Sequence, residues 1–469
     1  MKQKFAGILL IPLALAPLAT TSLQAQDRGT YALKDARVVR VSGPVIEHGT
    51  VVVRDGLIEA VGANITPPAD AWVIDCKGLT VYPGLIDSLS TWGNTNTPPA
   101  AAAAAAGGRG GGRGAVVATP VVATPTPAVS TAPPSRGPED RPSTASWLKA
   151  ADQIFPTDRA IESARNGGFT SAVTFPTGNI FAGQGSVIDL AGDRAGDMVL
   201  ADAIGQYITI PSGRGGGGGR GYPGSLMGVI AYIRQIYMDA EHYKLAKSIY
   251  EKHPDGLQRP AYDRALEGVI ASPRVLLPAT RDVEILRMIA FAKEMKLNAI
   301  LYGGHEAWRS ADAIKKAGLP VLLSLKYPER VADSDPALEE PLRVLELRDK
   351  APTAAAALEK AGVKFAFYSD GQSTPRDLMA AVKKAVDAGL TPDGAIKALT
   401  LNAAEIYGVS NRVGSIDKGK IANLVVSDGD IFGVRTRVKY VFVDGGKYEP
   451  LPEEPAGGRG GRAGRSGGF

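Results

Sequence analysis

The arrangement of apolar and polar residues divides the chain into two β-rich ends and a long alternating middle. Short β-type apolar runs lie near both ends, at 36–41, 50–53, 57–61, 423–427 and 438–443. Asp55-Gly56 separates two of these runs, and Asp444-Gly445 follows the last. Asp-Gly beside runs of Val, Leu and Ile is a strong hairpin signal. The pattern predicts one small β-sandwich domain built from both chain ends, over residues 29–80 and 409–450.

In the middle, short apolar strands alternate with helical segments. The expected strands are 171–175, 274–277, 298–302, 321–325 and 363–368. The expected helices are 226–251, 281–295, 307–317, 375–388 and 392–399. Continuous apolar strands are typical of parallel sheets covered on both faces, and their regular alternation with helices favours a closed barrel over an open sheet. We therefore predict an α/β fold with a (β/α)8 TIM-like barrel over residues 81–408.

Low-complexity tracts interrupt this order. The largest, at 94–146, holds an alanine run, a Gly/Arg stretch and a Thr/Pro/Val segment, and Gly/Arg tracts recur at 213–221 and 451–469. Such compositions bury too little apolar surface to offset the entropy lost on ordering. We predict a disordered insertion in the barrel, a disordered loop and a disordered tail.

The N-terminus has the order of a secretory signal. Lys2 and Lys4 precede an apolar stretch at 5–19, and small and polar residues end at Ala25. The apolar stretch is shorter than the ~20 residues that a membrane span needs. We predict a signal peptide over 1–25, no membrane span, and a periplasmic or secreted protein. An uncleaved anchor is the alternative, although prolines interrupt the stretch.

Cysteine content and charge narrow the picture further. Cys76 is the only cysteine, so no disulfide forms within the chain. The net charge is +5, yet seven arginines lie in the Gly-rich tracts: Arg109, Arg113, Arg214, Arg220, Arg459, Arg462 and Arg465. The rest of the chain is therefore not basic, and we expect no nucleic-acid partner. Polyanion binding through the tracts remains an alternative, although few aromatic residues adjoin them for stacking.

Several motifs resemble the amidohydrolase superfamily, in particular exported proteins of the imidazolonepropionase-like type. The segment 49–62 resembles the opening hairpin of that family, and Val81-Tyr82-Pro83-Gly84-Leu85-Ile86-Asp87 resembles its first barrel strand. The segments 398–408 and 414–426 resemble its closing part, with Asn423 where the family usually has Asp. The resemblance covers nearly the whole chain beyond the signal and implies a hydrolase of non-peptide C–N bonds, such as amides and cyclic amides.

The resemblance also implies a divalent metal, usually zinc, at the barrel mouth. The family's ligands are a His-x-His pair after the first strand, a lysine or carboxylate midway, histidines after two later strands, and an aspartate after the last. The metal activates water and polarises the scissile carbonyl. At the matching positions this chain has Ser88, Ser90, Ala201, Pro278 and Tyr302. We call these the vestigial metal positions, and we expect no metal cofactor.

Three residues that follow two of the predicted strands could still act catalytically. Asp370 follows the strand at 363–368 and matches the last-strand aspartate of the family; otherwise it accepts backbone hydrogen bonds or caps a helix. His305 and Glu306 open a helix after Gly303-Gly304, where a lone histidine is more often structural than a ligand. The other histidines, His48, His242 and His253, follow no predicted barrel strand.

A glycine-rich loop supplies two further candidates. Gly178-Asn179-Ile180-Phe181-Ala182-Gly183-Gln184-Gly185 follows a predicted strand and resembles a loop of exported amidohydrolases. At the carboxyl end of a barrel strand, Asn179 and Gln184 would contact substrate. The alternative is a turn in which the glycines serve only the backbone.

The sequence leaves three hypotheses. The first is a non-catalytic homologue that keeps the barrel, with a small-molecule ligand or partner at its mouth. The second is an active C–N hydrolase with a reduced or metal-free site that uses Asp370. The third is the polyanion-binding protein described above.

Overall fold

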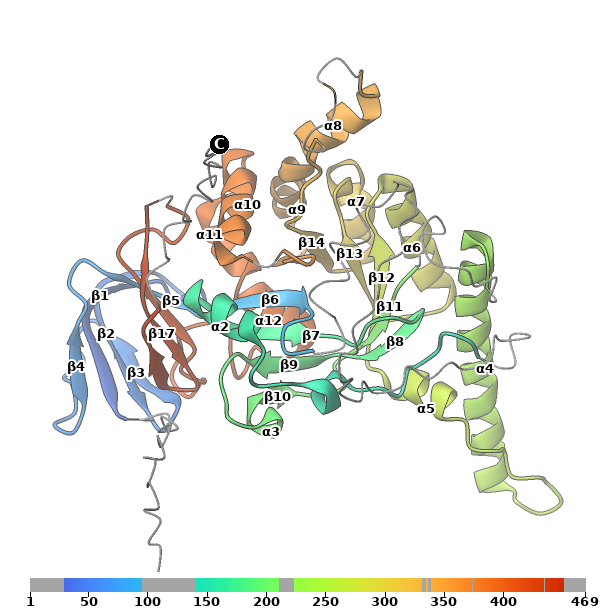
Figure 1. Cartoon of the computed structure of the whole chain (residues 1–469). Helices are drawn as coiled ribbons and strands as arrows, with labels where there is room; N and C mark the ends of the chain where they lie inside the picture. The colour runs from blue at the N-terminus through green and yellow to red at the C-terminus, as the bar shows by residue number, and fades with distance from the viewer. Residues whose placement is uncertain are drawn as a thin grey trace, which may run out of the picture.

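The computed structural model describes residues 29–94, 141–210, 223–330, 335, 339–372, 374–433 and 435–450. The predicted signal peptide, the Gly/Arg loop at 213–221 and the tail at 451–469 lie outside the described residues, as does most of the predicted insertion. A β-rich domain, a barrel and a long projecting helix follow one another across the molecule (Figure 1).

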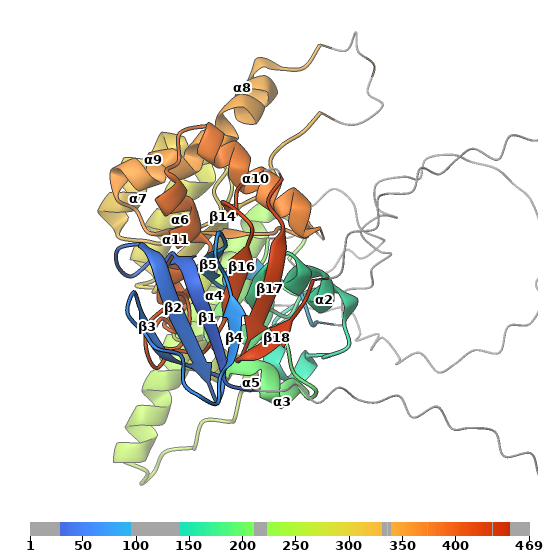
Figure 2. The same ribbon diagram turned by 90° about the vertical axis from the view of Figure 1, so that its left-hand side faces the viewer.

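Strands from both chain ends hydrogen-bond into one sheet, as predicted. The strands are β1 (Tyr31–Val38), β2 (Ile46–Arg54), β3 (Leu57–Gly62), β4 (Trp72–Asp75), β5 (Thr80–Pro83), β16 (Leu424–Ser427), β17 (Val438–Val443) and β18 (Gly446–Tyr448). Their order is β18-β17-β16-β5-β1-β2-β3, with β4 also paired to β1. Figure 2 shows the N-terminal strands in blue beside the C-terminal strands in red. Because β1 pairs with β4 along its first half and with β5 along its second, the sheet divides there and encloses a core that includes Leu33, Val53 and Phe442.

Both Asp-Gly signals form the predicted hairpin turns. Asp55 and Gly56 connect β2 to β3 with φ of 50° and 80°, and Asp444 and Gly445 connect β17 to β18 with φ of 48° and 75°. Two successive positive φ angles are the requirement of a type I′ turn, which glycine meets without strain. The two turns also contact one another, since a Cβ on Gly445 would lie 2.6 Å from the Gly56 Cα.

The barrel is built from strands that alternate with helices. Its strands are β6 (Leu85–Ser90), β7 (Phe169–Thr174), β8 (Phe181–Gln184), β9 (Ser186–Asp189), β11 (Gln206–Ile208), β12 (Val275–Ala279), β13 (Ala299–Gly303), β14 (Val321–Ser324) and β15 (Phe365–Tyr368). β11 to β15 are parallel neighbours in chain order, β6 is parallel to β7, and β15 contacts β6. The predicted α/β barrel with a composite β domain is confirmed.

Helices and shorter elements surround this ring. The helices are α2 (Arg159–Asn166), α3 (Ala195–Met198), α4 (Leu226–Lys252), α5 (Arg264–Ala271), α6 (Asp282–Glu294), α7 (Ala307–Ala317), α8 (Leu342–Lys350), α9 (Ala354–Ala361), α10 (Pro375–Asp387), α11 (Pro392–Ala398) and α12 (Leu401–Tyr407). Two 3-10 turns, η2 (Ala150–Gln153) and η3 (Ala351–Thr353), and the short strand β10 (Val199–Ala201) complete the described elements. The helices predicted from the 3.6-residue periodicity begin and end within two residues of these bounds.

One part of the ring departs from a regular parallel barrel. β8 and β9 follow one another with only Gly185 between them, and they run antiparallel to β11 and β7 respectively. This single extended stretch therefore joins the two halves of the barrel wall. No pattern in the sequence indicates this direction, because a short apolar run looks the same in parallel and antiparallel strands.

Side chains alternate between the barrel interior and the helical layer. Leu276 and Ile300 are register partners on β12 and β13, Leu322 and Ala366 are register partners on β14 and β15, and all four belong to one core cluster inside the ring. Their sequence neighbours Leu277, Leu301, Leu323 and Phe367 belong to the larger cluster against the helices. Residues two positions further along each strand therefore face the interior again, at the carboxyl end.

The predicted insertion is corrected at its C-terminal boundary. We expected disorder over 94–146, but residues 141–146 pack against the barrel, and 95–140 lie outside the described residues. Thr144 shares a 2.7 Å hydrogen bond with the Tyr232 hydroxyl, and the fully buried Ser146 donates to the carbonyl of Ala265 over 2.5 Å. Composition alone missed this, because these small polar residues are ordered by distant partners.

None of the described helices combines enough length with enough apolar character to cross a bilayer.

Candidate functional site

The two serines at the end of β6 are buried in the barrel wall. Ser88 has no exposed surface, its hydroxyl donates to the carbonyl of Phe367 over 2.6 Å, and its own carbonyl accepts from the Tyr407 hydroxyl over 2.6 Å. Ser90 is also buried, and its hydroxyl accepts the backbone N–H of Trp92 over 3.2 Å. Both hydroxyls therefore serve local hydrogen bonds in the wall.

Asp87 links β6 to the end of β15 through hydrogen bonds. Its carboxylate accepts the backbone N–H groups of Ser369, at 3.0 Å, and Leu89, at 3.3 Å. The second oxygen is buried without a partner among the described residues. Burial raises the pKa of Asp87 to about 7, against the lowering effect of its hydrogen bonds with Ser369 and Leu89. The residue thus closes the ring where the barrel begins and ends.

Pro278 and Tyr302 lie side by side on the interior side of the neighbouring strands β12 and β13. They are register partners, each two residues beyond an interior core position, Leu276 and Ile300. Proline offers no side-chain ligand atom. The Tyr302 hydroxyl donates to the carbonyl of Ile208 over 2.9 Å. Both vestigial positions are therefore inside the barrel mouth but present no group that binds zinc well.

Five aromatic residues pack against one another inside the barrel, and we name them the mouth aromatic cluster: Phe175, Tyr207, Tyr302, Tyr368 and Tyr407. Ring centroids lie 5.3 Å apart for Phe175–Tyr207 and Tyr207–Tyr302. They lie 6.5 Å apart for Tyr302–Tyr368 and Phe175–Tyr407. These separations are those of packed aromatic pairs.

The tyrosines of the mouth aromatic cluster stay neutral at ordinary pH. Burial raises the pKa of Tyr207, and it raises the pKa values of Tyr302, Tyr368 and Tyr407 well above their usual range. The Asp370 carboxylate adds to this effect on Tyr207, Tyr302 and Tyr368, so it faces the cluster. A neutral phenol is a poor ligand and a poor nucleophile, which leaves the cluster a packing role.

Asp370 lies at the solvent-exposed edge of this cluster. It follows β15 with a left-handed φ of 50°, and its carboxylate accepts the Ser324 hydroxyl over 2.7 Å. Ser324 ends β14 and also accepts the backbone N–H of Lys326 over 3.1 Å. Asp370 is thus accessible from outside, whereas Ser88 and Ser90 are not.

His305 lies near Asp370, at the end of β13. The residue is half-buried, and its Nε2 atom is enclosed without a partner among the described residues. Burial lowers the pKa of His305, and the Asp370 carboxylate and a backbone hydrogen bond with Lys326 offset this only in part. His305, Ser324 and Asp370 therefore form a small polar group over three adjacent strand ends, with a neutral imidazole.

Glu306 is directed away from this group. It is the N-cap residue of α7, but its carboxylate makes no cap hydrogen bond there. Instead it accepts the backbone N–H of Asp282 at the start of α6 over 2.9 Å, with the Arg343 guanidinium 3.7 Å away. The helix N-terminus that it stabilises is therefore that of the neighbouring helix α6.

The glycine-rich loop uses its two candidate residues in backbone contacts. The Gln184 amide is buried and donates to the carbonyls of Ser146 and Gly268, both over 3.1 Å. The Asn179 carbonyl accepts the Thr209 hydroxyl over 2.7 Å. These contacts give the loop a structural role, and substrate contact by Asn179 or Gln184 remains a prediction.

The residues at the barrel mouth do not fit the family's metal. Ala201 lies on β10, paired with Val187 of β9, and supplies no ligand atom. Within the described residues, no three His, Cys, Asp or Glu side chains gather as metal ligands would. His48 pairs with Asp35 in the β domain, and His242 and His253 belong to α4 and its C-cap. No hydrolytic step through a metal can be built from these side chains.

Sequence reasoning missed most of the mouth aromatic cluster and Ser324. Tyr302 was singled out only as a missing histidine. Tyr368 lies two residues before the candidate Asp370, so an aromatic residue beside a candidate catalytic residue was an available signal. Tyr407 gave no such signal, since it reaches Ser88 from 319 residues away.

The barrel, the composite β domain and the strand-end positions of the site define the amidohydrolase class of fold. Residues 247–447 match the model of the amidohydrolase family. An amidohydrolase from Thermotoga maritima MSB8 is structurally similar with a TM-score of 0.70 and 26% sequence identity, over 89% of this chain and all of that one. No curated protein sequence is similar enough to the chain to count as a match.

More distant solved structures share the fold alone. Molinate hydrolase is 17% identical with a TM-score of 0.51, over 91% of this chain and 96% of that one. A Xaa-Pro dipeptidase with bound methionine in its active site is 16% identical with a TM-score of 0.50, over 90% of this chain and 100% of that one.

Proposed function

We propose that this chain is an exported, metal-free homologue of the amidohydrolases that has lost hydrolytic activity and keeps the barrel as a binding scaffold. The observation that carries the proposal is the fully buried Ser88, which bonds to the barrel wall and to Tyr407 of the mouth aromatic cluster. A metal-activated water needs imidazole or carboxylate ligands and an open coordination position. Here a hydroxyl bonded to the wall and packed aromatic rings occupy that place.

The proposed export rests on the sequence of residues 1–25. A basic start, a short apolar stretch and a small-residue end are the features that secretory signals share. The proposed periplasmic or secreted location follows from this segment and is independent of the barrel.

Metal content and turnover of the purified protein test the proposal. After incubation with zinc and dialysis, we expect substoichiometric metal by plasma mass spectrometry and no hydrolysis of cyclic amides, hydantoins or N-acyl dipeptides above the buffer rate. Stoichiometric zinc together with turnover would overturn the proposal. Ser88→His serves as a control for the wall, because an imidazole has no room where Ser88 is fully buried, and we expect it to lower stability without creating activity.

A second candidate function is a metal-free C–N hydrolase that uses Asp370. The observation in its favour is the accessible Asp370 carboxylate beside Ser324 and His305. If wild-type protein shows turnover without metal, Asp370→Asn should abolish it while the circular-dichroism spectrum stays unchanged. Asp393→Asn, in the first turn of α11, is the matched control and should leave any turnover intact. Equal turnover in wild type and Asp370→Asn would exclude this assignment.

A further inference from the structure

The C-terminal third of α4 stands clear of the barrel. The buried residues of this helix are Val229, Tyr232, Ile233, Ile236, Ala240 and Tyr243, and none of residues 244–252, all of which are described, is buried. Figure 1 shows this end of α4 extending past the rest of the molecule. A free helical segment of this length has little stability by itself in water.

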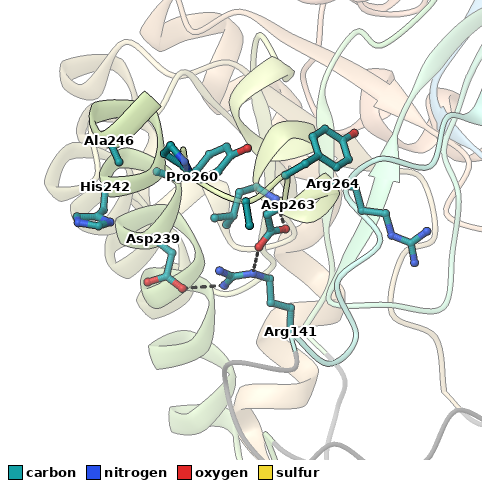
Figure 3. A pocket seen from close by; sticks show the side chains of 11 residues that line it. Arg141, Asp239, His242, Ala246, Pro260, Asp263 and Arg264 are labelled. Carbon is teal, nitrogen blue, oxygen red and sulfur yellow. Dashed lines mark hydrogen bonds and ion pairs between the residues drawn. The ribbon is translucent and has the colours of Figure 1, made fainter. Parts of the chain in front are cut away.

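The base of this projection is held firmly. Arg141 donates to Asp239 on α4 and to Asp263, the N-cap residue of α5, each over 2.7 Å (Figure 3). Further along, Lys247 pairs with Glu267 of α5 over 2.5 Å. These ion pairs fix the direction of α4 but leave its outer face uncovered.

Large apolar side chains line that outer face. Leu245 is 59% exposed and Ile249 is 46% exposed, one helical turn apart. Met238 lies two turns before Leu245, and Leu257 follows the helix; both are also exposed. Residues spaced by seven and four positions form one stripe along a helix, as in a coiled-coil seam. An apolar stripe of this length on a projecting helix indicates an interaction surface.

The charges beside the stripe are self-complementary. Glu241, Lys244 and Glu251 recur at helical spacing along one flank, with Lys252 beside them, and all four are exposed. When two copies of α4 run antiparallel about a two-fold axis at the level of Lys247, each flank faces the same flank of the other copy. Lys244 then meets Glu251 of the second copy, and Glu241 meets Lys252 of the second copy.

The same arrangement pairs the apolar residues. Leu245 meets Ile249 of the second copy twice about the axis. We propose that α4 is the self-association surface of this protein and that a second copy of the chain covers it in an antiparallel helix pair.

The interface is small. From Met238 to Lys252 the helix is about 22 Å long at 1.5 Å per residue. Interfaces of this size lie at the lower end of those that hold stable dimers. Dimerisation should therefore depend on protein concentration.

Light scattering coupled to gel filtration of the full mature chain, over a broad concentration series, tests the proposal. We expect twice the chain mass at high concentration, and a shift to the single-chain mass with Leu245→Glu, with dimerisation at least about tenfold weaker. Leu342→Glu is the matched control, because Leu342 is 79% exposed on α8, away from α4; its mass should equal that of wild type. A single-chain mass at every concentration, or a dimer that survives Leu245→Glu, would overturn the proposal.

A charge swap tests the antiparallel register. Lys244→Glu places like charges opposite each other and should weaken dimerisation, and the double variant Lys244→Glu with Glu251→Lys should restore it. The two residues are seven positions apart on one helix, too far for an ion pair within α4, so recovery reports on contact between copies. A double variant no stronger than Lys244→Glu would refute this register.

Discussion

Replacing Phe175 with alanine should lower the free energy of unfolding by about 3–5 kcal/mol, as expected for loss of a fully packed phenylalanine. Phe175 is 1% exposed and contacts both Tyr207 and Tyr407 in the mouth aromatic cluster. Its ring also lies on Gly185, where a Cβ would come within 2.2 Å of a ring carbon. The neighbours are held by other hydrogen bonds, so they cannot collapse into the space that the variant opens.

Urea denaturation followed by circular dichroism measures this loss. Phe155→Ala is the matched control, because Phe155 is 49% exposed and its loss should cost well under ~1 kcal/mol. Similar values for the two variants would contradict the packed mouth on which the proposed function depends.

The stability of the protein should fall as pH rises from about 4 to about 7, and Asp189→Asn should flatten this decline. The pKa of Asp189 is raised from 3.8 to about 7, mainly by burial and also by the Asp444 carboxylate, against the lowering effect of hydrogen bonds from Asn423 and Ser171 and of the charge of Arg412. A raised native pKa means that the folded chain binds this proton more tightly than the unfolded chain. The resulting stability is complete below pH 4 and is lost as pH approaches 7.

A shift of about three pKa units corresponds to about 4 kcal/mol at most. Asp87, with its pKa also raised to about 7 by burial, contributes in the same direction, so Asp189→Asn should remove only part of the slope. Unfolding by urea at a series of pH values measures it. Asp417→Asn is a control of opposite sign: despite partial burial, Ser415, Arg40 and Ser42 hold the pKa of Asp417 at about 2. This variant should lower stability by a constant amount between pH 4 and 7 and change the pH slope only in the acid range. A wild-type curve that rises between pH 4 and 7 would contradict the prediction.

The local signals in the sequence predicted the architecture well. The Asp55-Gly56 and Asp444-Gly445 turns formed as expected because their backbone requirement is local. The helices α7 and α10 begin at the predicted residues, since the apolar spacing of each lies within the element itself. The composite β domain followed from similar texture at both ends of the chain.

The contents of the barrel mouth depend on contacts that no local pattern encodes. Tyr407 comes from α12 and bonds to Ser88 far earlier in the chain. Ser324, at the end of β14, bonds to Asp370, which follows the neighbouring strand β15. The antiparallel course of β8 and β9 likewise depends on partners on either side. The sequence could therefore identify what the vestigial positions lack, but not which residues fill the space.

The pairing of β5 with β16 has a consequence for the order in which the protein is made. During synthesis β1 to β5 emerge first, and one edge of β5 stays without its neighbour until residues 424–427 are available. An uncovered strand edge can pair with other chains. The partly synthesised chain is therefore prone to aggregation. The sheet is complete only after the C-terminal strands have been synthesised and have paired.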